Sequence, residues 1–90
     1  MSIAIELIKE ERQNQIDQGY SEFHDDRLKN FELAMAADSY IMTVISPDEE
    51  GDATWMKNKW KPSDDPIRNL VKAGALIAAE IDRLQRKRIG

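Results

Sequence analysis

The last third of the chain, from Asp64 to Arg88, constrains the fold more than any other stretch. Asp65 can cap the start of a helix, and Pro66 suits the first helical position, where its missing N–H would be unpaired in any case. Basic residues gather at the far end, where the helix dipole favours positive charge. Apolar and small residues recur at steps of three and four, the spacing of one helix face: Ile67, Leu70, Val71, Gly74, Ile77, Ala78, Ile81 and Leu84. We predict a helix over 65–88 against which the rest of the chain packs.

Two further helices are predicted, over 3–18 and 30–45. Ser2 is the expected cap of the first, and Gly19 ends it. Asn30 is the expected cap of the second, which is apolar over most of its circumference and is therefore central or has another partner. On the first helix, Glu11 and Gln15 fall on the apolar stripe. Either this end protrudes past the core, or these polar groups are paired or belong to a site.

The remaining segments read as connections. Residues 20–26 form an irregular link, and residues 46–53, with proline, glycine and four acids, are expected to be a mobile loop. An aromatic, partly ordered link then leads to the last helix. The prediction is a single all-α domain over residues 1–90, made of three helices with an irregular aromatic loop before the C-terminal one.

Composition excludes several classes of protein. The 41% apolar content can form a core, while the formal charge of −4 and the lack of a basic face argue against a nucleic-acid-binding protein. The absence of cysteine rules out disulfides and thiolate metal sites, and fits a reducing compartment. No apolar run approaches the roughly 18 residues that cross a membrane. Because Glu6 and Glu10 interrupt any signal-peptide pattern, we expect a cytoplasmic protein with no membrane partner.

The most unusual chemistry lies at His24, the only histidine, which directly precedes Asp25 and Asp26. Such a run can offer oxygen and imidazole ligands to a metal ion, or a carboxylate that orients the ring. Alternatively, one acid ends a turn and His24 packs beside Tyr20 and Phe23. Both interpretations remain open at this point.

A second set of candidates flanks the start of the last helix. Trp55 and Trp60 alternate with lysines and can stack on a base while the lysines meet phosphate, or they can simply cover the core. Arg68, in the first turn, suits a phosphate, or it pairs with Asp64 or Asp65. We predict one ligand-binding site with two supporting acids, formed by His24, Asp25, Asp26, Trp60, Lys61 and Arg68, with Glu11 and Glu32 as the supports.

The order of short motifs resembles a set of small helical proteins encoded by phages and prophages. The motifs are Glu11-Arg12-Gln13, Gly19-Tyr20, His24-Asp25-Asp26, Glu32-Leu33-Ala34, Trp60-Lys61-Pro62, and the run from Leu70 to Leu84. The resemblance covers nearly the whole chain apart from the acidic loop. It implies an all-helical fold and a phage accessory role in the host cytoplasm, without a particular activity. Members often have more aromatic residues and prolines before the Trp-Lys-Pro motif, so it implies no pocket role for Trp55.

Three functions follow as hypotheses. The first is a protein that binds or sequesters a small nucleotide-derived ligand without a cofactor, with countering of host defence as the use that such sequestration would serve. The second is a Mg²⁺-dependent nucleotide pyrophosphohydrolase similar to MazG-like enzymes, which pair acids one helical turn apart. Three residues after Glu32 stands Met35, and three after Glu80 stands Arg83, so neither acid has a second acid at that offset. The third is a helical adaptor for a host protein. Because a short chain has little room for a pocket, a homo-oligomer, dimer or higher, is expected, with the largely apolar second helix as the pairing surface.

Overall fold

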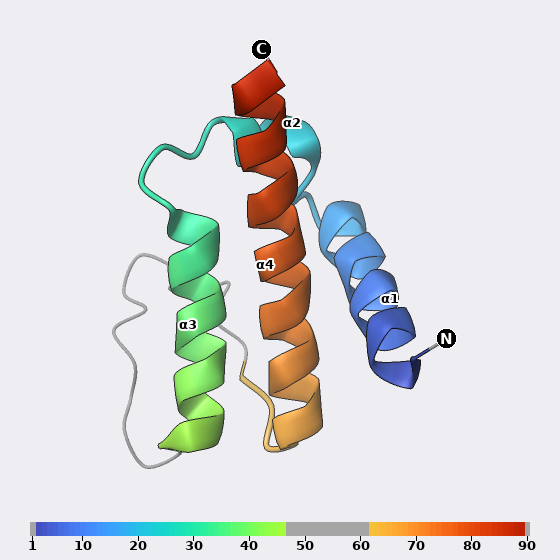
Figure 1. The fold of residues 1–90 in the computed structure, drawn as a ribbon. Helices are drawn as coiled ribbons and strands as arrows, with labels where there is room; N and C mark the ends of the chain where they lie inside the picture. The colour runs from blue at the N-terminus through green and yellow to red at the C-terminus, as the bar shows by residue number, and fades with distance from the viewer. Residues whose placement is uncertain (1, 47–61, 90) are drawn as a thin grey trace.

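The computed structural model describes residues 2–46 and 62–89, and within these stretches the chain is helical without strands. Four helices follow one another, α1 (Ile3–Asp17), α2 (Glu22–Asp26), α3 (Glu32–Ile45) and α4 (Pro66–Ile89) (Figure 1). The predicted all-α class is confirmed. The acidic loop, except Ser46, and the aromatic link with Trp55, Trp60 and Lys61 lie outside the described residues.

The helix count differs from the prediction, because part of the link at 20–26 is helical. Ser21 caps α2, its Oγ accepting a hydrogen bond from the His24 N–H at 3.3 Å. A five-residue helix is too short to show a hydrophobic period, so the sequence pattern cannot reveal it. The helical geometry of α2 determines the directions in which the side chains of residues 22–26 point.

α4 is the central element, as expected, because it contacts each of the other three helices. In Figure 1 it stands between α3 and α1, with α2 beside its C-terminal half. The predicted start is confirmed: Pro66 is the first residue, and Asp65 Oδ1 accepts a hydrogen bond of 2.9 Å from the Ile67 N–H. Buried Asn69 secures the preceding turn through hydrogen bonds to both backbone groups of Ser63.

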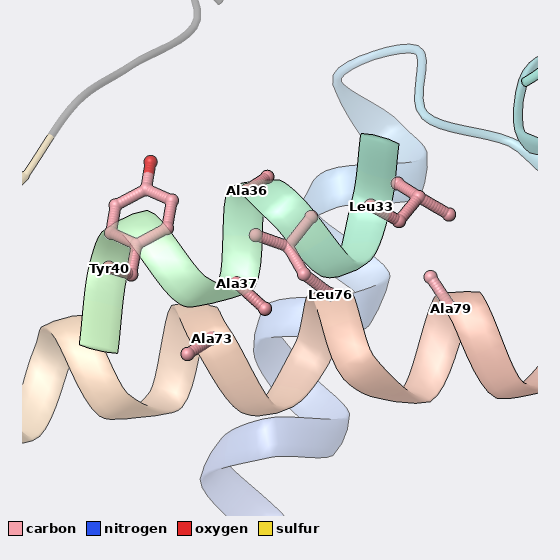
Figure 2. Packing of buried hydrophobic residues seen from close by; sticks show 7 residues of the cluster. All are labelled: Leu33, Ala36, Ala37, Tyr40, Ala73, Leu76 and Ala79. Atoms are coloured by element: carbon pink, nitrogen blue, oxygen red, sulfur yellow. The ribbon is translucent and has the colours of Figure 1, made fainter. Parts of the chain in front are cut away.

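The core lies between α3 and α4, which run antiparallel (Figures 1 and 2). Figure 2 shows Tyr40 toward the part of α4 that carries Ala73, and Leu33 toward the part that carries Ala79. Alanines on both helices let the two backbones approach closely, so few large side chains are needed. The core residues are Leu33, Ala36, Ala37, Tyr40, Ala73, Leu76 and Ala79, with Leu28 and Ile41 packed against them.

The buried face of α4 is not the one that the apolar spacing predicts. Val71 is buried as expected, but Ile67, Leu70, Ile77 and Ile81 are exposed. The prediction was wrong because α3 packs on the alanine-rich side of α4, and polar residues that find partners occupy the rest of the buried surface. The buried residues are Asn69, Val71, Ala73, Ala75, Leu76, Ala79, Glu80 and Arg83.

The start of α3 also differs from the prediction. The capping position is held by Phe31, in a left-handed conformation with φ of 59°, and its side chain makes no capping hydrogen bond. Asn30, the expected cap, instead donates its backbone N–H to Glu32 Oε1. Non-glycine residues adopt positive φ only at a cost in energy, so other contacts must hold this turn in place.

Candidate functional site

Asp25 is the most buried ionisable side chain of the described residues, with no exposed surface. Its carboxylate accepts a hydrogen bond of 2.8 Å from Arg12 on α1 and lies 3.1 Å from His24 Nδ1. The other terminal nitrogen of Arg12 donates to the Tyr20 carbonyl at 3.0 Å. Removing a carboxylate from water is costly unless it is paired and hydrogen-bonded, so Asp25 requires both partners. This network ties α2 to α1.

The network also sets the orientation of the His24 ring. An ionised carboxylate only accepts hydrogen bonds, so the contact with Asp25 favours the tautomer that carries the proton on Nδ1. Nε2 has no hydrogen-bond partner among residues 2–46 and 62–89, and the side chain is 29% exposed. Tyr20 contacts the ring edge-on, with 5.3 Å between the ring centres. Two of the contacts expected from the sequence are therefore present: the Asp25 carboxylate lies beside the ring, and Tyr20 packs against it.

Phe23 and Arg27 extend this surface along α2. Phe23 is 76% exposed, which is unusual for an aromatic side chain on a small domain. The Arg27 guanidinium lies 5.9 Å from the centre of the Phe23 ring. Arg27 forms no ion pair with any carboxylate of the described stretches. An exposed ring, a cation without an ion-pair partner among the described residues and a histidine held beside Asp25 thus lie within residues 23–27, on α2 and its C-cap.

Asp26 has a different role from Asp25. It is about half exposed and pairs with Arg86 on α4, which places Nη2 2.8 Å and Nε 2.9 Å from Oδ1. Glu22 approaches the same guanidinium at 3.9 Å. The hydrogen bond that Arg86 donates to Asp26 is the main reason why the pKa of Arg86 lies above its ordinary value. These contacts dock α2 onto the C-terminal half of α4.

Glu11 and Arg68 form a separate group across α1 and α4. Their side chains make an ion pair in which Glu11 is buried and Arg68 is 42% exposed. Arg68 therefore does not use the nearby acids, Asp64 and Asp65, that the sequence offered as partners. Buried Glu11 also shows that this part of α1 does not protrude past the core. No hydrogen bond or ion pair joins Arg68 to the α2 acids in the described chain.

The predicted site residues are therefore distributed over several places. His24, Asp25 and Asp26 lie together on α2, whereas Glu11 and Arg68 pair elsewhere. Glu32 lies at the start of α3, where it accepts the Asn30 N–H. The predicted positions of Trp60 and Lys61 lie outside the described residues.

The sequence analysis missed Arg12, Phe23, Arg27 and Arg86 as members of the α2 group. Arg12 and Asp25 are thirteen residues apart, and Asp26 and Arg86 are sixty apart, so no local spacing connects them. Phe23 and Arg27 carry a weak local signal, because residues four apart meet on a helix, but the signal requires knowing that α2 is helical.

The three buried carboxylates of the described chain each form an ion pair with an arginine. Glu11 pairs with Arg68, Asp25 with Arg12, and Glu80 with Arg83. Within residues 2–46 and 62–89, no three histidine, aspartate or glutamate side chains are grouped so that they could hold a metal ion. The set of converging acids required by the pyrophosphohydrolase hypothesis is thus not found in this part of the chain.

The fold and the site describe a small all-α protein with a charged, partly aromatic surface at one end of its central helix. Comparison with protein-family models, with curated proteins and with solved structures gives no match. Among the helices described, none has the length and apolar character required to span a bilayer.

Proposed function

We propose that this chain is a non-enzymatic binding protein that captures a small nucleotide-derived ligand on the surface of α2. The observation that carries the proposal is the His24 ring, oriented by a fully buried Asp25 that is itself held by Arg12. A ligand group that meets Nε2 finds the ring already in place, so little ordering cost remains at binding.

Phe23 and Arg27 supply the other contacts that such a ligand needs. Exposed aromatic rings stack on nucleobases, a contact worth about 1–3 kcal/mol per base. Arg27 already lies against the Phe23 ring and has no described carboxylate partner, so it can bind a phosphate without first giving up an ion pair. The opposite situation holds at Arg86, because a phosphate there would have to displace Asp26.

This proposal keeps His24 and Asp25 from the sequence prediction and replaces Arg68 by Arg27 as the phosphate-binding arginine. Arg12 and Asp25 are positioning residues, since they act through the His24 ring. As an accessory protein of phage type, the chain would sequester the ligand in the host cytoplasm. The proposal requires no cofactor.

Thermal-shift and calorimetric titrations of the full chain test it, with ATP, a cyclic dinucleotide and inorganic phosphate as probes, each with and without Mg²⁺. A nucleotide should raise Tm in the absence of Mg²⁺, and Phe23→Ala and Arg27→Ala should each lower the affinity about tenfold or more. Lys9→Ala, which removes an exposed cation on α1, is the matched control and should bind as wild type.

Three results would count against the proposal. Equal nucleotide binding by wild type and by folded Phe23→Ala and Arg27→Ala variants would place the site elsewhere. Turnover of a nucleotide that depends on Mg²⁺ would favour the pyrophosphohydrolase. If no probe binds the folded wild-type chain, the helical adaptor becomes the better hypothesis.

A further inference from the structure

α4 carries four large apolar side chains that the described helices leave exposed. Ile67, Leu70, Ile77 and Ile81 are 62%, 48%, 41% and 53% exposed. We call these four residues the α4 stripe. Single exposed apolar residues are common, but four large ones on one face of one helix are of the kind that marks an interaction surface. The core does not need them, because it uses a different side of α4.

The order of residues along the stripe indicates what covers it. Ile67 and Ile81 lie seven residues to either side of Gly74, and Leu70 and Ile77 lie four and three residues from it. Reversing the helix about Gly74 therefore brings apolar residues onto apolar residues. We propose that a second copy of this chain docks antiparallel on the α4 stripe, so that Ile67 meets the partner's Ile81 and Leu70 meets the partner's Ile77. Such an interface is isologous and closes with two copies.

The charges at the two ends of α4 favour this direction. Asp64 and Asp65 are exposed just before the helix, and Lys87 and Arg88 are exposed in its last turn. At a rise of about 1.5 Å per residue, both ends are roughly 15–20 Å from Gly74. An antiparallel pair places the acidic end of one helix beside the basic end of the other, and opposes the helix dipoles. A parallel pair would place like charges together.

α1 borders the stripe and would extend the interface. Ile8 is half-buried and lies over Gly74, where an added Cβ would come within 2.7 Å of its Cδ1. Ile5, three residues earlier on α1, is 59% exposed. A specific interface needs roughly 800 Å² from each partner, which is more than one helix stripe supplies, so contacts from α1 are part of the proposal. The inference replaces the pairing surface predicted on residues 30–45, where Leu33, Ala37 and Tyr40 are buried against α4.

Sedimentation equilibrium of the full chain tests this interface independently of any ligand. The chain mass is 10.4 kDa, and wild type should sediment with twice that mass. Ile77→Lys should return it to one chain, while Ile45→Lys, the matched change of an exposed isoleucine at the end of α3, should leave the dimer intact. Circular dichroism confirms the fold of each variant, and Ile81→Lys is the second variant if Ile77→Lys does not fold.

A charge exchange tests the direction of the two helices. Asp64→Lys should weaken the dimer, and adding Lys87→Glu in the same chain should restore it, since the reversed pair is again complementary. A wild-type monomer at every concentration, or a mass other than two chains, would overturn the proposal. So would a folded Ile77→Lys variant that remains dimeric, or a double charge exchange that weakens the dimer further.

Discussion

The Glu80 carboxylate on α4 accepts a hydrogen bond of 3.2 Å from the Ala34 N–H in the first turn of α3. α3 has no side-chain cap of its own, so a residue forty-six positions away takes over that role. The carboxylate lies at the positive end of the helix dipole, which favours it there. Its other oxygen pairs with Arg83, which also donates to the Leu28 carbonyl at 3.1 Å and lies 5.6 Å from the centre of the Phe31 ring.

Replacing Glu80 by alanine should therefore destabilise the fold more than most single changes. The variant loses the α3 cap and leaves Arg83, only 5% exposed, as a buried unpaired charge. We expect a loss of about 3–5 kcal/mol in the free energy of unfolding, measured by urea denaturation. Asp82→Ala, an exposed acid on the same helix, is the control and should change stability by about 0.5 kcal/mol or less. If both variants lose equally little free energy of unfolding, Glu80 does not act as a stabilising cap of α3.

The neighbouring acids Asp25 and Asp26 should respond very differently to the same substitution. Asp25→Ala removes the fully buried carboxylate that Arg12 and His24 contact. It should lower the free energy of unfolding by about 3–5 kcal/mol. Asp26→Ala breaks a half-exposed ion pair and should cost about 1 kcal/mol or less. In a double-mutant cycle, the Asp25→Leu, Arg12→Met double variant should lose less stability than the two single variants added together. Each single change leaves one buried charge without its partner, whereas the double variant leaves none. Additive losses would contradict a direct Arg12–Asp25 coupling.

Gly74 should be sensitive to a single added methyl group. Alanine is the better helix former by about 1 kcal/mol, but its Cβ would lie 2.7 Å from Ile8 Cδ1 and 2.9 Å from Cγ1. Rotation about χ2 of Ile8 can relieve the first contact but not the second, so either Ile8 must leave its χ1 rotamer or α1 must move away from α4. We expect Gly74→Ala to destabilise wild type and to stabilise an Ile8→Ala variant by about 0.5–1 kcal/mol. The same sign in both backgrounds would show that α1 does not press on Gly74.

The raised pKa of Tyr20 predicts that the fold loses stability at alkaline pH. Burial, and next the neighbouring Tyr40, raise the pKa of Tyr20 above its ordinary value of 10.0. The unfolded chain therefore loses this proton first, and the contribution to stability is fully present below pH 10.0 and is lost as pH rises through the raised pKa. Unfolding curves at increasing pH should show a smaller alkaline loss for Tyr20→Phe than for wild type. An identical pH profile for both would exclude Tyr20 as the source.

Much of the fold could be predicted from local signals. The start of α4 follows from the cap at Asp65 and Pro66. The extents of α1 and α3 to within two residues, and the all-α class, follow from a period of three to four residues. The His24–Asp25 contact was also among the open interpretations, because adjacent residues need no knowledge of the fold. These features depend on residues close together in the chain, where sequence spacing and distance in space correspond.

The tertiary structure decided which face of each helix is buried and which charges meet. Periodicity marks the apolar stripe of α4, but only the packing of α3 shows that alanines are buried while Ile77 and Ile81 face outward. Likewise, Glu11 could have paired with any cation, and the crossing of α1 and α4 assigns it to Arg68. Hydrophobic burial is non-directional, and ion pairs across fifty or sixty residues depend on how helices dock, which no local pattern encodes.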